Sequence, residues 1–192
     1  MARWQPGAAE RLVVAAVDLF NEQGYDATTV TQIAQRAGVT KSTFFRHFSD
    51  KRELLVAGQE TLSRLLADGI TDAPASVSPL QAVAAGLERA SSAMGPTNRE
   101  LGPRLKAAVA ASTELQERDA LKSVGLAAAM TTALIARGVP ESTAQVAAEL
   151  GLLAFKRGYA QWSEGERDDE EGLAPHALAA LEDLRAATAS LG

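Results

Sequence analysis

The chain has 192 residues, 46% of them hydrophobic and 22% charged, an ordinary globular balance with room for one module of roughly 50 residues and one core-forming domain of more than about 100. It has no cysteine, which excludes disulfides and thiolate metal sites, and no signal-peptide pattern or run of about 18 uninterrupted apolar residues, so we expect a cytoplasmic protein. The net charge of −5 is unevenly divided: residues 1–52 hold seven Lys and Arg against five Asp and Glu, and the other 140 residues hold twelve against nineteen, so that a locally basic end still suits a nucleic-acid partner.

The first expected helix covers residues 9–23. Its apolar residues recur at helical spacing, namely Leu12, Val13, Ala16, Val17, Leu19 and Phe20. Gly24 ends this helix, and Thr28 or Thr29 caps the next one, where the hydroxyl either accepts a backbone N–H or reaches a nucleic-acid phosphate. Before the helix, Arg3 and Trp4 either follow a nucleic-acid groove or belong to a disordered terminus, and we favour disorder.

Residues 29–51, TVTQIAQRAGVTKSTFFRHFSDK, have the pattern of two short helices joined by a tight turn. The first helix carries an apolar stripe at positions i, i+3, i+4 and i+7, formed by Val30, Ile33, Ala34 and Ala37. Gly38 supplies the left-handed conformation that closes a helix. Thr40 is a suitable N-cap for the second helix, and Phe44 and Phe48 lie one turn apart on the face that docks against the first.

The opposite face of the second helix is short, polar and cationic, and it carries Lys41, Ser42, Thr43, Arg46 and His47. Hydroxyl groups of this kind can approach base edges while lysine and arginine neutralise phosphates, so the pattern indicates a helix-turn-helix whose second helix enters a major groove. The alternative is a helical hairpin with a merely solvated face. We favour the helix-turn-helix because the turn glycine, the cap and the basic face coincide at the required spacing.

Residues 10 to about 58 closely resemble the N-terminal domain of TetR/AcrR-type (tetracycline repressor-like) transcriptional regulators, through the segments LFNEQGYDATTV, IAQRAGV, STFFRHF and DKREL. The resemblance implies an all-helical homodimer that binds a palindromic DNA operator and releases it when a small molecule occupies the C-terminal domain. Phe45 stands where the family usually has a tyrosine, which removes a hydroxyl contact to phosphate. His47 either approaches a base or phosphate or packs against the next helix.

Asp50 and Glu53 are in capping-box register, which predicts a long helix from there to about Asp68 with Lys51 on its first turn, in contact with phosphate. The complete expected DNA-contacting set is Thr29, Lys41, Ser42, Thr43, Phe45, Arg46, His47 and Lys51. We expect a helix-turn-helix domain over residues 1–52, joined through this helix to a ligand-binding and dimerisation domain over residues 53–192.

The second domain is expected to be helical as well, after a break over Thr71 to Pro79. Ser78 caps and Pro79 opens a helix to about residue 94, the Gly-Pro pairs at 95–96 and 102–103 interrupt the chain, and further helices are expected over 113–137, from 141 onward, and over 175–191. The fold class is therefore all-α.

The helix that begins at residue 141 carries a stripe of small residues beside a bulky one. We expect this helix and the last one to pair with their two-fold mates in a four-helix bundle, where the resemblance also places the dimer contact, through Ala147, Gly151, Ala154, Gly158, Leu181 and Leu184. The alternative is an intramolecular core without a partner.

A second apolar set, Met94, Met130, Phe155, Tyr159 and Trp162, either lines a ligand cavity or belongs to the core. The segments STELQER and ELGLLAFKRGYAQW resemble those of regulators grouped with acyl-CoA-like ligand binders, so we expect an apolar, aromatic or acyl-type effector.

Catalytic chemistry is not indicated, because His47 and His176 are the two histidines and no Ser/His/Asp set, phosphate loop or metal-spaced cluster appears. The acidic run from Asp168 to Glu171 is either a cation site or, as we favour, a solvated loop. We therefore expect a ligand-responsive DNA-binding repressor without metal or cofactor. The alternatives are a regulator that meets no ligand and a helical binding protein or enzyme whose N-terminal hairpin is only structural.

Overall fold

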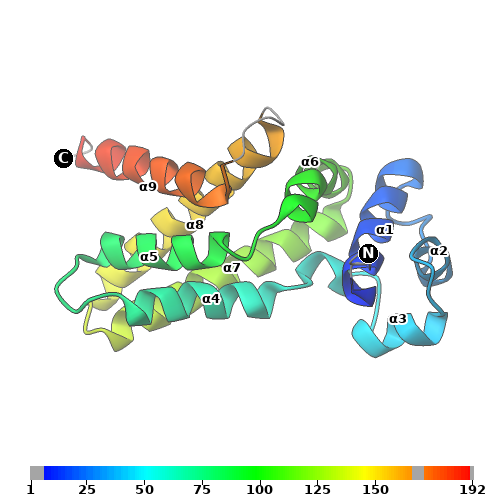
Figure 1. The fold of residues 1–192 in the computed structure, drawn as a ribbon, viewed down its shortest axis with the longest axis horizontal. Coiled ribbons are helices and arrows are strands. Elements are labelled where there is room, and N and C mark those ends of the chain that lie inside the picture. Colours follow the sequence, from blue (N-terminus) through cyan, green and yellow to red (C-terminus); the bar gives the residue numbers. More distant parts are fainter. Residues whose placement is uncertain (1–6, 166–170, 191–192) are drawn as a thin grey trace, which may run out of the picture. The chain divides into compact units, whose positions relative to one another are not determined.

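The computed structural model describes residues 7–165 and 171–190, and within them every regular element is a helix (Figure 1). The all-α class is confirmed. In chain order, the elements are α1 (Ala8–Gln23), α2 (Val30–Arg36), α3 (Lys41–His47), the 3₁₀ turn η1 (Glu53–Val56), α4 (Gln59–Asp72), α5 (Pro79–Ser91), α6 (Pro96–Ala110), α7 (Thr113–Ala136), α8 (Glu141–Glu164) and α9 (Leu173–Ala189).

The helices form two compact units. The head unit contains the chain up to Ala57 together with Pro103–Ala120, and the body unit contains Gly58–Gly102 and the residues from Leu121 onward. The expected division was 1–52 and 53–192. Sequence reasoning did not anticipate that the end of α6 and the start of α7 pack with the N-terminal helices, so that both helices contribute residues to both units.

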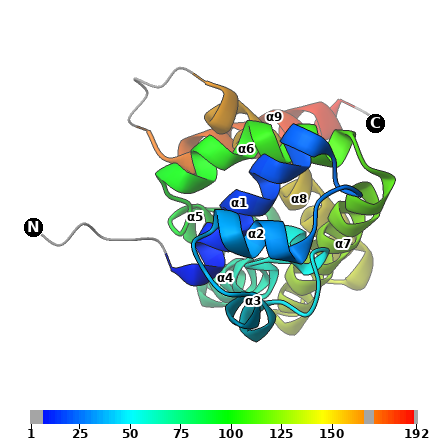
Figure 2. The ribbon, with the colours of Figure 1, turned by 90° about the vertical axis from the view of Figure 1, so that its right-hand side faces the viewer.

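The head unit is held by one apolar core to which α1, α2 and α3 all contribute, and these helices pack against one another (Figure 2). Its largest fully buried apolar side chains are Leu12, Ile33, Phe44 and Leu115. Leu115 comes from α7, nearly 60 residues beyond η1 in the sequence. Burying such side chains contributes roughly 1.5–3 kcal/mol each relative to exposure, which explains why residues 103–120 belong to this unit.

The expected continuous helix from residue 50 to about residue 68 is wrong. The Asp50 carboxylate does accept the backbone N–H groups of Arg52 and Glu53, at 2.7 and 3.2 Å, but only the short turn η1 follows. Gly58 then takes a left-handed φ of 77° and begins α4, which runs to Asp72. Glycine adopts this conformation without the steric cost of a Cβ, so the chain turns where the pattern predicted a helix.

The body unit is a second apolar core built from α4, α5, the later part of α7, α8 and α9. Ser78 caps α5, as expected. Its hydroxyl accepts the N–H of Gln81, and the Gln81 side chain accepts the N–H of Ser78. Pro103 lies inside α6, so the second expected interruption is not a break. Among the described helices, α7 alone is long and apolar enough to span a membrane. This is weak evidence, because the core helix of a globular protein can have the same length and composition. Met130 and Leu134 of α7 are buried in the body core.

Two glycines in helix interiors provide a matched test of the body packing. A Cβ at Gly69 would lie 2.6 Å from the Ala85 carbonyl oxygen and 2.7 Å from the Gly86 Cα, both rigid backbone atoms of α5. Gly69→Ala is therefore expected to lower the free energy of unfolding by about 1–3 kcal/mol.

The control is Gly125→Ala, where the nearest atom is the mobile Gln59 amide nitrogen at 2.5 Å. Because that side chain can swing away and alanine favours helix by about 0.8–1.0 kcal/mol over glycine, this variant should be neutral or stabilised in urea unfolding. Equal destabilisation of both variants would contradict the packing of α4 on α5.

Candidate nucleic-acid interface

Local hydrogen bonds close both the start of α2 and the turn between α2 and α3. The Thr29 hydroxyl accepts the N–H of Gln32 at 3.2 Å, and the Gln32 side chain accepts the N–H of Thr29 at 2.8 Å, which completes a capping box. Gly38 takes a φ of 67°, and Val39 then donates its N–H to the Ala34 carbonyl at 2.9 Å. This glycine-dependent closure sets the angle at which the next helix leaves α2.

The helix α3 is anchored by its aromatic residues. Its N-cap Thr40 accepts the N–H of Thr43 at 3.1 Å. Phe44 is 0% exposed, and its ring lies 5.8 Å from that of Phe48, which is also buried. Because both rings point into the head core, the opposite face of α3 is left to solvent.

That opposite face contains the predicted polar and cationic residues. Lys41, Ser42, Phe45, Arg46 and His47 are all exposed, and Thr43 is half-buried. The structure therefore brings six of the eight predicted DNA-contacting residues together on one helix face. Phe45 is 50% exposed, with its ring edge-on to Phe44 at 5.4 Å and 5.8 Å from the Lys41 ammonium. His47 is exposed while its ring lies 6.3 Å from that of Phe48.

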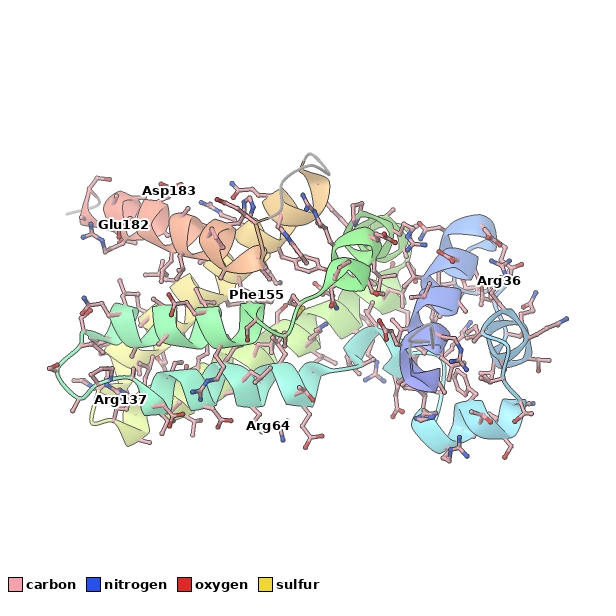
Figure 3. All side chains as sticks on the ribbon, viewed as in Figure 1. Arg36, Arg64, Arg137, Phe155, Glu182 and Asp183 are labelled. Atoms are coloured by element: carbon pink, nitrogen blue, oxygen red, sulfur yellow. The ribbon has the colours of Figure 1, made fainter. Side chains whose placement is uncertain are left out.

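The charges of the head unit are distributed unequally. Arg36 of α2 (Figure 3) pairs with Glu22 of α1 at 2.7 Å, and hydrogen bonding to this arginine holds the pKa of Glu22 below its usual value. Arg52 pairs with Asp50, also at 2.7 Å. Lys41 and Arg46 have no ion-pair partner among the residues that the structure describes. Lys41 and Arg46 of α3 therefore present positive charge that no carboxylate of the described residues neutralises.

The two threonines before α2 have different roles. Thr28 is 1% exposed and donates its hydroxyl to the Gly24 carbonyl at 2.7 Å. Thr29 is exposed and provides the cap, but its hydroxyl also lies 2.9 Å from the Gln32 side-chain oxygen. A phosphate that approached Thr29 would compete with this local hydrogen bond.

Lys51 has a different environment from the one expected. Its ammonium donates to the Tyr25 carbonyl at 2.7 Å and to the Thr28 carbonyl at 3.1 Å, and it lies 4.0 Å from the centre of the Tyr25 ring. Two of its three N–H groups are thus engaged by the turn that precedes α2. Sequence reasoning treated Lys51 as a surface charge because nothing in the local pattern shows that the carbonyls of residues 25 and 28 converge on it.

Tyr25 is a residue whose importance the sequence did not reveal. It is 5% exposed, and its hydroxyl donates to the Glu114 carboxylate at 3.1 Å. Burial is the main cause that raises the pKa of Tyr25 well above its usual value, and the hydrogen bond and charge of Glu114 raise it further. The available signal was general: a buried tyrosine needs a partner for its hydroxyl. Only the fold identifies that partner as the first turn of α7.

The five predicted ligand-lining residues lie in or against the body core. Met130 is fully buried, Phe155 and Trp162 are buried, and Met94 and Tyr159 pack against them. Their rings are in contact, with 6.3 Å between Phe155 and Tyr159 and 5.9 Å between Tyr159 and Trp162. Tyr159 donates to the Asn98 carbonyl at 2.6 Å, and burial raises its pKa to about 12. In the structure these five side chains contribute to the packing of the body core.

The six predicted dimer residues are buried inside the chain's own core. A Cβ at Gly158 would lie 2.5 Å from the backbone of Ala177 in α9, and one at Gly151 would lie 2.5 Å from a methyl group of Val83 in α5. The small-residue stripe therefore serves close packing of α8 against its own neighbours. The sequence could not distinguish this from a dimer contact, because both require small residues at helical spacing.

The body surface carries a groove and exposed apolar side chains instead. A groove of about 1010 Å³ lies between the start of α5, the start of α8 and the later part of α9, and its lining includes Leu80, Val146, Leu150, Leu178, Glu182 and Arg185. Glu182 is an exposed residue of α9 (Figure 3). On α8, Val146 is 59% and Leu153 is 40% exposed.

The described residues contain no group of three or more His, Asp or Glu that could hold a metal ion. Of the predicted acidic loop from Asp168 to Glu171, residues 168–170 lie outside the described part of the chain.

Comparison with known proteins agrees with this geometry. Residues 12–57 match the family described as bacterial regulatory proteins, tetR family. The HTH-type transcriptional regulator TcmR of Streptomyces glaucescens is 38% identical over 74 residues, which cover 38% of this chain and 33% of TcmR. The tetracycline repressor protein class A of Escherichia coli is 40% identical over 62 residues, or 32% of this chain and 27% of the repressor. The chain thus spans about a third, or less, of the length of the curated relatives it matches.

Solved structures of transcriptional regulators share the fold over nearly the whole chain. A transcriptional regulator of the TetR/AcrR type from Aquifex aeolicus VF5 superposes with a TM-score of 0.54 at 21% identity, covering 93% of this chain and 98% of that one. The regulator FadR from Bacillus subtilis, in complex with stearoyl-CoA, gives 0.57 at 17% identity, covering 90% and 95%. Residues 12–57 of the head unit thus match the N-terminal domain of tetR-type regulatory proteins, and the fold of the chain is similar to that of solved TetR-type regulators.

Proposed function

We propose that this chain is a ligand-responsive DNA-binding transcriptional regulator, a repressor that binds a palindromic operator as a homodimer. The observation that carries the proposal is the exposed face of α3, where Lys41 and Arg46 lack ion-pair partners among the described residues while Phe44 and Phe48 fix the helix from behind. A rigid, cationic helix face of this kind suits a major groove.

The contacts divide by chemistry. Lys41, Ser42 and Thr43 stand at the start of α3, where short or flexible polar groups reach base edges. Arg46 and His47, one turn later, face phosphates. Phe45 offers an apolar edge where the family tyrosine would offer a hydroxyl, a chemistry that suits a thymine methyl group. Thr29 adds a contact to the sugar-phosphate backbone beside α2.

The DNA proposal is tested on a duplex obtained by selecting a random library on the full-length protein. Arg46→Ala should weaken binding to every duplex and lower the slope of log affinity against log salt by about 1, because a phosphate contact releases about one counterion. Lys41→Ala and Thr43→Ala should change preference at particular base pairs, by about 1–3 kcal/mol each.

Failure of the wild-type protein to enrich any sequence would refute the proposal and favour a helical binding protein or enzyme with a structural hairpin. Equal effects of Lys41→Ala and Thr43→Ala on every sequence variant would refute the base-reading role alone.

The proposed homodimer uses the outer face of α8 rather than the buried small-residue stripe. Val146 and Leu153 lie seven residues apart on that exposed face. An antiparallel two-fold pairing centred on Leu153 places Glu149 opposite Arg157 of the other copy, and both are exposed without an ion-pair partner among the described residues. A closed two-fold interface requires such self-complementary charges.

Leu153→Glu is expected to reduce the solution mass to that of one chain in sedimentation, because it places like charges at the two-fold axis. Leu121→Glu on α7 is the control, since Leu121 is 61% exposed but lies outside the proposed face. The double exchange of Glu149→Arg with Arg157→Glu should retain the dimer that either single change weakens. A wild-type mass of one chain would overturn this part of the proposal.

The proposed effector is an apolar or acyl-type molecule that occupies the body unit beside Met94, Met130, Phe155, Tyr159 and Trp162. The support comes from the apolar and aromatic character of this cluster and from fold neighbours: FadR from Thermus thermophilus was solved in complex with lauroyl-CoA and shares the fold with a TM-score of 0.51 at 22% identity, covering 92% of this chain and 93% of that one. Binding in the body would change the separation of the two α3 helices and release DNA.

Thermal unfolding with lauroyl-CoA and stearoyl-CoA checks this effector class. At about 100 times the dissociation constant a ligand of the folded state adds roughly 2.7 kcal/mol to stability, so the midpoint should rise with either thioester and the selected duplex should be released. Coenzyme A without an acyl chain is the control. A shift of equal size with coenzyme A alone, or no shift with either thioester, contradicts an acyl-type effector.

A further inference from the structure

A continuous series of polar contacts crosses the head unit from α7 to the start of α2. Glu114, on the first turn of α7, accepts the hydroxyl of Tyr25 at 3.1 Å. The carbonyl of Tyr25 and that of Thr28 both accept from the Lys51 ammonium, at 2.7 and 3.1 Å. Thr28 is followed directly by Thr29, the N-cap of α2.

We propose that Glu114, Tyr25 and Lys51 are positioning residues that make the placement of α2 and α3 on DNA depend on the first turn of α7. The inference rests on the proposed DNA-binding function and deepens it. It also gives Lys51 a role different from the phosphate contact expected from the sequence.

Lys51 suits this role because its ammonium is already satisfied by the protein. Two N–H groups donate to carbonyls, and the Tyr25 ring at 4.0 Å faces the charge. Removing the ammonium would deprive the Thr28 carbonyl of this donor and leave the Tyr25 carbonyl with the Thr28 N–H at 3.2 Å, so the turn would relax even though no DNA contact had been lost.

The turn is held by hydrogen bonds at both ends, through which a displacement at Tyr25 would be passed on to α2. The Thr28 hydroxyl donates to the Gly24 carbonyl at 2.7 Å, and the Gln23 side chain donates to the Thr28 hydroxyl at 3.2 Å. At the other end Thr29 is locked to Gln32 by the capping box. Because α2 and α3 pack against each other, α3 must follow a shift in α2.

Helix α7 is suited to drive such a shift because it contributes residues to both compact units. In the head, Leu115 is 0% exposed and fixes the helix beside Glu114, and Arg52 adds a second contact to Glu114 at 3.7 Å. Helix α6 is attached to the same unit through the ion pair of Arg104 with Asp18 and the 2.9 Å hydrogen bond from Asn21 to the Arg104 carbonyl.

The test measures affinity for the selected duplex at a temperature where all variants are folded. Glu114→Leu is expected to lower the affinity about tenfold, since it removes a hydrogen bond to a charged acceptor. Glu114→Gln should restore most of the loss, because its amide oxygen can still accept the Tyr25 hydroxyl. The matched control Glu117→Leu removes an exposed carboxylate from the next turn of α7 and should have no effect.

Lys51→Met separates positioning from phosphate contact. It should lower affinity about tenfold with no change in the salt slope, and adding Glu114→Leu should cost little more, because both changes release the same turn. A fall of about 1 in the salt slope for Lys51→Met would assign Lys51 to phosphate and overturn the proposal.

Additive losses in the double variant, or a Glu114→Leu protein that melts earlier but binds DNA normally when folded, would also overturn the positioning role. A wild-type protein that selects no duplex is a different result. It contradicts the DNA-binding proposal itself.

Discussion

The burial of Phe44 in the head core is the interaction on which the candidate DNA surface depends. Helix α3 has seven residues, too few to persist alone in water, because helix nucleation is unfavourable and isolated helices shorter than roughly 12 residues are marginal. Its conformation comes from the Thr40 cap and from the two phenylalanines that enter the core. Since these hold one face inward, Lys41 and Arg46 are presented on the other without having to stabilise the fold.

The contacts around Lys51 are explained by the need of polar groups in the head unit for hydrogen-bond partners. The Lys51 ammonium is half-buried beside an aromatic ring, and the backbone carbonyls of one turn accept its hydrogen bonds. Residues 103–120 complete this arrangement by bringing Glu114 to Tyr25. A segment distant in sequence thus contributes to the environment of residues that adjoin the candidate DNA surface.

In the body, apolar side chains alone do not decide between a core, a cavity and an interface. The small residues of α8 meet α5 and α9 of the same chain, and the aromatic residues pack on one another. A different stripe of α8 is exposed to solvent. It contains Val146 and Leu153, with Glu149 between them and Arg157 one turn after Leu153. A helix that is apolar over much of its circumference carries both stripes. Helical periodicity alone does not show which stripe is buried within the chain and which faces a partner.

The sequence by itself determined the features that depend on neighbouring residues: the all-α class, the caps Thr40 and Ser78, the turn at Gly38, and the cationic face of α3, because capping, φ preference and helical spacing are local. Tertiary structure alone decided the break at Gly58, the attachment of residues 103–120 to the head, the engagement of Lys51, and the inward direction of Gly151 and Gly158. Each of these depends on atoms from segments remote in the chain, and their approach is set by the packing of whole helices rather than by any pattern along one of them.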